Sequence, residues 1–138
     1  MATLHLEVAT PDGLALHAEV DIVTAPSVEG EFGVLPGHLP LLAATKAGLL
    51  KYRVAGKDEV AAIGPGFVEA LPDRVLVLTD AFVKPANVDR AAAEKDLSAA
   101  EKAAADYKGP QDDAAYQEIA RSLDWARARL DASKGSSN

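Results

Sequence analysis

The 138 residues of this chain include no cysteine, which excludes disulfides and cysteine-ligated metal sites. Basic residues are fewer than acidic ones: 14 lysines and arginines and 21 aspartates and glutamates give a net charge of −7. Such a balance argues against a general nucleic-acid binder, which needs a basic face. No apolar run approaches the roughly 20 residues that a membrane-spanning helix needs, and the N-terminus does not resemble a signal peptide.

Catalytic and metal-binding motifs are missing as well. The three histidines, His5, His17 and His38, have no second ligand at the spacing that a metal site on one helix requires. The chain contains neither a phosphate-binding loop of the GxxxxGK[ST] form nor a GxSxG nucleophile. This pattern favours a binding or coupling protein without metal or cofactor over an enzyme.

Two halves of the chain differ sharply in composition. Residues 1–84 hold eight of the ten glycines and six of the eight prolines, whereas residues 85–138 hold fifteen alanines. Glycine and proline separate short strands, and alanine favours helix. The sequence therefore predicts a β domain over 1–84 and a helical domain over 85–138.

The first half has the period of half-buried strands. Leu4, Leu6 and Val8 alternate with His5 and Glu7, and turn signals recur every 8 to 12 residues. This spacing is typical of an antiparallel β-sandwich or barrel.

The second half contains two apolar stripes with helical spacing. The break "KGPQDD" separates them, with Gly109 expected as C-cap and Pro110 as stop. Asn87 is the expected N-cap of the first helix, with Asp89 in its first turn. The pattern predicts an antiparallel helix hairpin, and its alanine-rich seam predicts a modestly stable one. The stripes comprise Ala93, Leu97, Ala100, Ala104 and Tyr107, then Tyr116, Ile119, Leu123, Ala126 and Leu130.

The stretch "EFGVLPGHLPLL", residues 31–42, is apolar but interrupted by two prolines and two glycines. Its composition leaves two interpretations open. The first is a structural loop tucked into the sandwich. The second is a docking surface that offers Val34, Leu35 and Leu39 to a partner. In both interpretations His38 is a hydrogen-bonding loop residue rather than a base.

The segment "VEGEFGVLPGHLPLLAATKAGLLKYRV", followed by "GFVEA" and "VLVLTD", resembles the epsilon subunit of the bacterial F-type ATP synthase, called delta in mitochondria. The resemblance covers the whole chain. It implies a sandwich of about ten strands followed by two antiparallel helices, without an active site. It also implies a place on the rotor stalk, bound to the gamma subunit and the c ring, at the cytoplasmic face of the bacterial plasma membrane.

The same resemblance assigns site residues. Glu31 and His38 match positions implicated in contacts with gamma and the c ring, beside Val34, Leu35 and Leu39. In many members the hairpin opens into the alpha–beta head and inhibits ATP hydrolysis. The basic residues that would then face the beta subunit are Arg121, Arg127, Arg129 and Lys134.

Some family members bind ATP on the closed hairpin, which here would use Asp89, Arg90, Arg121 and Arg127. This chain departs from their pattern, because Arg90 directly follows Asp89 in "NVDRAAAEK". Adjacent helical residues point about 100° apart and do not converge. We therefore expect weak ATP binding or none.

Two other functions compete with the rotor subunit. One is a free-standing ligand-binding sandwich with a helical tail. The other is a small hydrolase that uses Glu31, Asp80 and His38, although nothing in the sequence places these three residues together.

Overall fold

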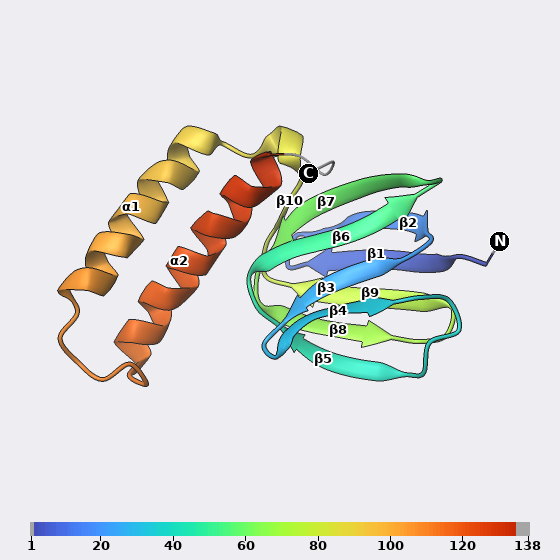
Figure 1. Ribbon diagram of the computed structural model, residues 1–138, viewed down its shortest axis with the longest axis horizontal. Coiled ribbons are helices and arrows are strands. Elements are labelled where there is room, and N and C mark those ends of the chain that lie inside the picture. Colours follow the sequence, from blue (N-terminus) through green and yellow to red (C-terminus); the bar gives the residue numbers. More distant parts are fainter. Residues whose placement is uncertain (1, 135–138) are drawn as a thin grey trace.

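The computed structural model describes residues 2–134, in which ten strands precede a helical hairpin (Figure 1). The predicted order of a β part followed by two helices is confirmed. The strands are β1 (Leu4–Thr10), β2 (Gly13–Val20), β3 (Val23–Ser27), β4 (Gly30–Val34), β5 (Leu41–Thr45), β6 (Gly48–Val54), β7 (Lys57–Ile63), β8 (Gly66–Ala70), β9 (Arg74–Thr79) and β10 (Phe82–Val83). The helices are the 3₁₀ turn η1 (Pro85–Asn87), α1 (Arg90–Asp106) and α2 (Ala114–Ser133).

The strands form a sandwich whose two sheets meet at one corner. One sheet has the order β10-β7-β6-β3-β4 and the other the order β5-β8-β9-β1-β2. Within residues 2–134 they are joined where Ser27 of β3 pairs with Thr45 of β5 and where Val28 N donates to Ala44 O. The predicted antiparallel sandwich of about ten strands is confirmed, and one pair departs from it, because β1 and β9 pair in parallel. Their connection runs through seven intervening strands, so no hairpin constrains their directions.

A single apolar core lies between the two sheets. The alternation predicted for the first strand is confirmed, since Leu4, Leu6 and Val8 are fully buried and His5 is exposed. Valines and leucines from the other strands complete the core, with Phe32 and Phe82 packed at its margin. Gly66 allows β8 and β9 to approach closely, because a Cβ at this position would collide with the backbone of Leu78.

The hairpin has the predicted stripes but different caps. All ten stripe residues are buried or half-buried. Asp89, not Asn87, caps α1, since its carboxylate accepts a hydrogen bond from Ala92 N at 3.0 Å. Asn87 is instead part of η1, because Pro85 starts a separate turn.

The C-cap of α1 is Tyr107 rather than Gly109. The Tyr107 hydroxyl donates to the carbonyl of Pro110 at 3.1 Å and to the carboxylate of Asp113 at 3.0 Å. A Cβ on Gly109 would lie 2.6 Å from this hydroxyl. A side chain at this position would therefore have to displace the tyrosine ring, and the glycine has no positive φ of a left-handed cap.

The hairpin packs on the sandwich through the C-terminal half of α2. A small cluster of Ala62, Ala128 and Ala132 forms this contact, with Leu49, Val83, Val88 and Trp125 around it. Figure 1 shows α2 beside β6 and β7, with α1 on the far side of α2. Neither helix is long and apolar enough to cross a membrane within the described residues.

Candidate docking surface

The loop between β4 and β5 is a fixed turn. His38 N donates to Leu35 O at 3.1 Å across Pro36 and Gly37, and Gly37 has a φ of 85°. Proline followed by a residue with positive φ is the signature of a type II turn. Gly37 N also donates to Pro72 O at 2.7 Å, which ties the loop to the β8–β9 turn. The glycines and prolines of this stretch therefore shape a turn held in place.

The turn presents two leucines to solvent. The exposed fractions are 56% for Leu35 and 80% for Leu39. The expectation that Val34 is also exposed is wrong, because its side chain is fully buried. Val34 is the last residue of β4 and pairs with the buried Val23, so strand alternation turns it into the core. The stretch thus combines a core residue with two exposed leucines.

Glu31 and His38 make separate contacts. Glu31 forms an ion pair with Lys51, with Oε2 and Nζ 3.1 Å apart. His38 Nδ1 lies 2.6 Å from the carbonyl oxygen of Leu39, which orients the ring along the turn. Asp80 instead lines grooves beside the β1–β2 turn. The hydrolase constellation of Glu31, His38 and Asp80 is therefore not assembled.

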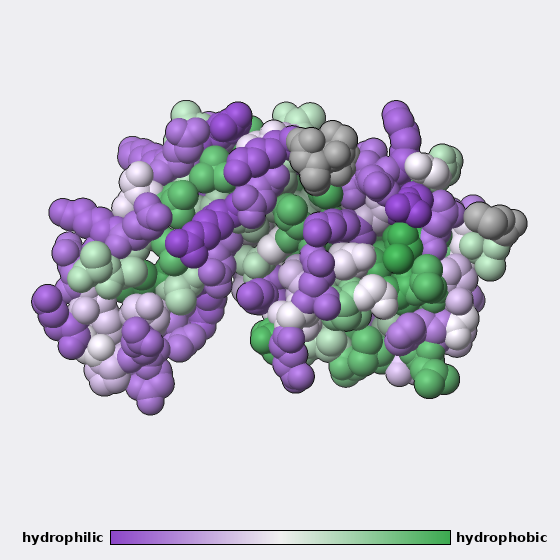
Figure 2. All heavy atoms as spheres, in the orientation of Figure 1, coloured by the Kyte–Doolittle hydropathy of each residue, from purple (hydrophilic) through white to green (hydrophobic). Residues whose placement is uncertain are grey.

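A second exposed apolar surface lies outside the predicted residues. Leu42, Phe67 and Leu78 are 70%, 54% and 48% exposed. Phe67 stands opposite both Ala44 and Leu78 in the sheet, so this surface crosses β5, β8 and β9. Figure 2 shows apolar residues gathered along the lower part of the sandwich. The sequence signal was "VLVL" at 75–78, since consecutive apolar residues indicate a strand covered on both faces.

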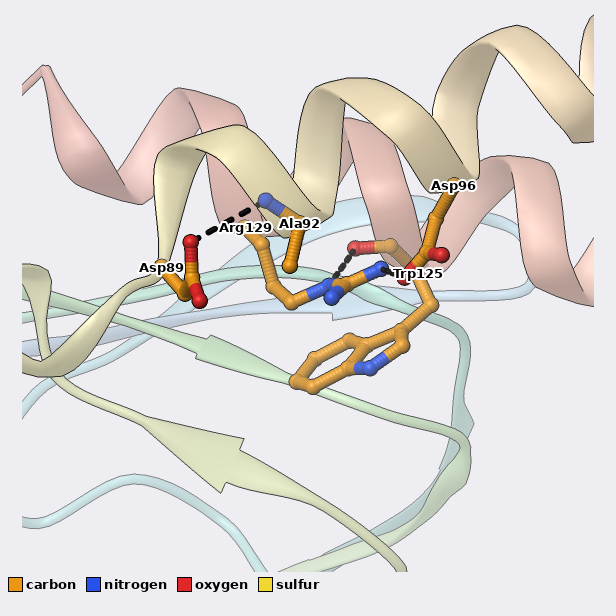
Figure 3. Close-up of polar contacts among 5 residues, drawn as sticks. All are labelled: Asp89, Ala92, Asp96, Trp125 and Arg129. Atoms are coloured by element: carbon orange, nitrogen blue, oxygen red, sulfur yellow. Dashed lines mark hydrogen bonds and ion pairs between the residues drawn. The ribbon is translucent and has the colours of Figure 1, made fainter.

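Inside the hairpin, a basic residue joins both helices (Figure 3). The guanidinium of Arg129 pairs with Asp96 of α1 at 2.9 Å and lies 5.5 Å from the ring centre of Trp125. Its side chain is only 17% exposed. In the closed hairpin Arg129 is therefore engaged within the chain.

The other predicted basic residues lie along α2. Arg121 pairs with Glu118 on the same helix at 2.9 Å, Lys134 is 3.9 Å from Asp131, and Arg127 is exposed. Arg121 and Lys134 are therefore each paired with an acidic neighbour at the surface, whereas Arg129 is held between the two helices.

The structure does not bring the candidate nucleotide residues together. The Asp96–Arg129 pair sets the antiparallel register of the helices. In this register Arg121 lies near residue 104, about 20 Å along the helix axis from Arg90. Asp89 is occupied as the N-cap of α1. The closed hairpin thus holds Asp89 and Arg90 at one end and Arg121 towards the other.

Comparison with known proteins places this architecture in a family. Residues 3–85 match the family profile of the ATP synthase delta/epsilon chain, β-sandwich domain. The ATP synthase epsilon chain of Halalkalibacterium halodurans is 37% identical over 131 residues, covering 95% of this chain and 97% of the relative. The epsilon chain of Magnetococcus marinus is 39% identical over 135 residues, covering 96% of each.

Solved structures show the same fold. A chain in the mitochondrial ATP synthase of Euglena gracilis aligns with a TM-score of 0.76 at 23% identity, covering 93% of this chain and 79% of that chain. A chain in the Tetrahymena thermophila mitochondrial ATP synthase central stalk and c ring aligns with a TM-score of 0.59 at 17% identity, covering 94% and 96%. Together, the profile match and the near full-length relatives show that this chain belongs to the delta/epsilon family of ATP synthase subunits.

Proposed function

We propose that this chain is the non-catalytic rotor subunit of an F-type ATP synthase that docks on the gamma subunit and the c ring. The observation that carries the proposal is the fixed turn bearing Leu35 and Leu39, which are exposed although strongly apolar. Exposed apolar clusters on a rigid scaffold are typical of protein interfaces. Glu31 and the half-buried His38 supply polar groups in the same stretch of chain, and the Leu42, Phe67 and Leu78 surface would extend the contact.

We further infer that the two parts of the chain have separate roles. Residues 1–84 would provide docking and residues 85–138 regulation. The main sandwich core contains no residue of the hairpin, which supports independent folding of the docking part. Bound in this way, the chain would lie at the cytoplasmic face of the bacterial plasma membrane and contact the membrane only through the complex.

The regulatory role rests on how weakly the hairpin is held. Its contact with the sandwich is centred on Ala62, Ala128 and Ala132, and alanine contributes little buried area per residue. Opening would free Arg129 to join Arg121, Arg127 and Lys134 against acidic residues of the beta subunit in the alpha–beta head. Complementary charge would then favour the extended state.

Two experiments test these roles. A tagged chain should recover alpha, beta and gamma chains from membranes of its own source, and recovery of none of them would refute the rotor assignment. Deleting residues 110–138 should leave gamma binding intact but raise ATP hydrolysis by the reconstituted complex. Equal hydrolysis with full-length and truncated chains, at low and high salt, would leave coupling as the only role.

A free-standing ligand-binding sandwich is the second candidate function. It predicts no association with ATP synthase subunits, so the same recovery experiment separates the two. No observation in the described residues favours it over docking.

A further inference from the structure

The sandwich is open along the edge formed by β4 and β5. At one end of this edge, β5 meets the end of β3 and the β3–β4 turn, where Ser27 pairs with Thr45 and Val28 N donates to Ala44 O at 3.1 Å. The β4 and β5 strands form no ladder with each other. A groove of about 460 Å³ lies between them, with Phe32 and Leu41 on its walls.

The backbone of β4 has an unpaired side, the one that points away from β3. A two-residue turn joins β3 to β4, so Ser27 and Gly30 close the hairpin as a hydrogen-bonded pair. Pairs then alternate along an antiparallel ladder. Pro26 opposite Glu31 and Thr24 opposite Gly33 are therefore the positions without ladder bonds. This agrees with Pro26, which has no N–H to donate. The N–H and C=O groups of Glu31 and Gly33 consequently point away from β3.

The backbone of β5 has the same property at Leu42. Ala44 O accepts its bond from Val28, on the side away from β8. Residues two apart on a strand direct their backbone groups to the same side. The N–H and C=O of Leu42 therefore also face the open edge.

The β5 side of this edge lacks the charges and prolines that keep exposed strands from pairing, and β4 carries one charged residue, Glu31. Natural edges are protected by lysine, proline, bulges or a covering segment. The β5 strand reads "LLAAT" and holds no charge or proline. Val28 is 63% exposed and Leu42 70% exposed beside it. The only charged residues on the groove are acidic, Glu29 and Glu31. An apolar edge with free backbone groups indicates that another chain covers it.

We propose that an extended segment of the gamma subunit adds to the free edge of β4 as a further strand. The proposal rests on the docking function above, with which this edge is continuous through the turn at Leu35–Leu39. The segment carries apolar side chains that cover Phe32 and Leu41, and a basic residue that faces Glu29. Backbone pairing at Glu31 and Gly33 fixes its register.

Gly33 offers a selective test. It lies in extended backbone without a positive φ, and a Cβ there would meet Thr24 Oγ1 at 3.8 Å, an ordinary contact. Gly33→Pro removes the outward N–H, and edge strands tolerate proline where no ladder bond is lost. The matched variant Gly33→Ala keeps the N–H. Both should fold, as measured by thermal unfolding. With purified gamma subunit, Gly33→Pro should raise Kd roughly tenfold or more over Gly33→Ala.

Hydrogen exchange on the unaltered chain provides an independent measurement. Binding of the gamma subunit should slow exchange of the Glu31 and Gly33 amides, while the amide of Leu14 on β2 stays unchanged. A complex that forms without this protection, or with equal affinity for both variants, would overturn strand addition and leave the docking function standing. Protection that appears without gamma and rises with chain concentration would assign the edge to a second copy, which also overturns the proposal. Failure of the unaltered chain to bind gamma would refute the docking function itself.

Discussion

Arg129 of α2 and Asp96 of α1 form an ion pair that bridges the two helices, with Nη2 and Oδ2 2.9 Å apart. Arg129 also stacks on Trp125, and Trp125 packs beside the alanine cluster that joins the hairpin to the sandwich. One arginine is therefore linked to both contacts that hold the hairpin closed. Opening the hairpin must break the ion pair and move the tryptophan.

Replacing Asp96 with asparagine should weaken this closure. An ion pair that is partly exposed contributes up to about 1 kcal/mol, so we expect a loss of about that size in the free energy of closure. Trp125 is the single tryptophan of the chain, and its fluorescence reports its surroundings directly. Glu118→Gln is the matched control, because Glu118 pairs with Arg121 on the same helix. Equal fluorescence changes in both variants would argue against the interhelical pair as the closing contact.

Enlarging the alanine contact should displace the hairpin. Ala128 is 3% exposed and faces Ala62, which is fully buried. Ala128→Leu should destabilise this contact by about 1–3 kcal/mol, the usual range for overpacking. Limited proteolysis should then cut the hairpin faster while the sandwich stays resistant. Ala115→Leu, at an exposed position of α2, should leave the cleavage rate unchanged. Rapid cleavage of both variants would show that the added side chain acts through the helix itself.

The sequence predicted the sandwich and the hairpin because periodicity and composition report them directly. It failed at Val34, because a one-residue shift in a strand end moves a side chain from surface to core. It failed at the N-cap of α1, because Asn and Asp are similarly favoured at that position and the turn at Pro85 moves the helix start from Asn87 to Asp89. The Asp96–Arg129 pair joins residues far apart in sequence, and no single-helix pattern shows it.

The docking surface was predictable only in part. Exposed Leu35 and Leu39 follow from a turn that the prolines and glycines indicate. The run of apolar residues at 75–78 indicates that Leu78 is covered, whereas Phe67 becomes a candidate only when the register places it beside Leu78. The free edge of β4 depends on which strand neighbours which, and that is a property of the topology.

The turn between the helices should loosen at alkaline pH. Partial burial and the hydrogen bond to Asp113 raise the pKa of Tyr107 above its ordinary value near 10. Because the pKa of Tyr107 is higher in the folded state, its contribution to stability is fully present below pH 10 and is lost as the pH rises through the folded-state pKa. As the pH rises through the folded-state pKa of Tyr107, hydrogen exchange of the Gln117 amide at the start of α2 should accelerate more than its intrinsic pH dependence predicts. Tyr107→Phe should lack this additional step, and the same step in both proteins would assign it to another group.

ATP should bind the closed hairpin weakly or not at all. The register set by Arg129 keeps Arg121 far from Asp89 and Arg90, so no cluster of charges surrounds one phosphate position. Calorimetric titration should give no saturation in the micromolar range. A dissociation constant of 1 μM, about −8 kcal/mol, would contradict this expectation. Loss of such binding in Arg121→Ala would further show that the helices rearrange around the nucleotide.

Substitutions at exposed and at buried residues of the 31–42 stretch should have different effects: the exposed ones should weaken gamma binding, and the buried one should lower stability. Leu39→Asp and Leu35→Asp place a charge where water already reaches, so the melting temperature should change little. Both should weaken binding to the gamma subunit, because a charge at the centre of an apolar contact is desolvated without a partner. Val34→Ala should do the opposite. It leaves a cavity in the core and costs about 2 kcal/mol of stability, while gamma binding at low temperature should persist. Calorimetric melting and gamma affinity, measured on all three variants, test whether Leu35 and Leu39 serve docking and Val34 serves the core. A large fall in melting temperature for Leu35→Asp would show that this leucine supports the fold instead.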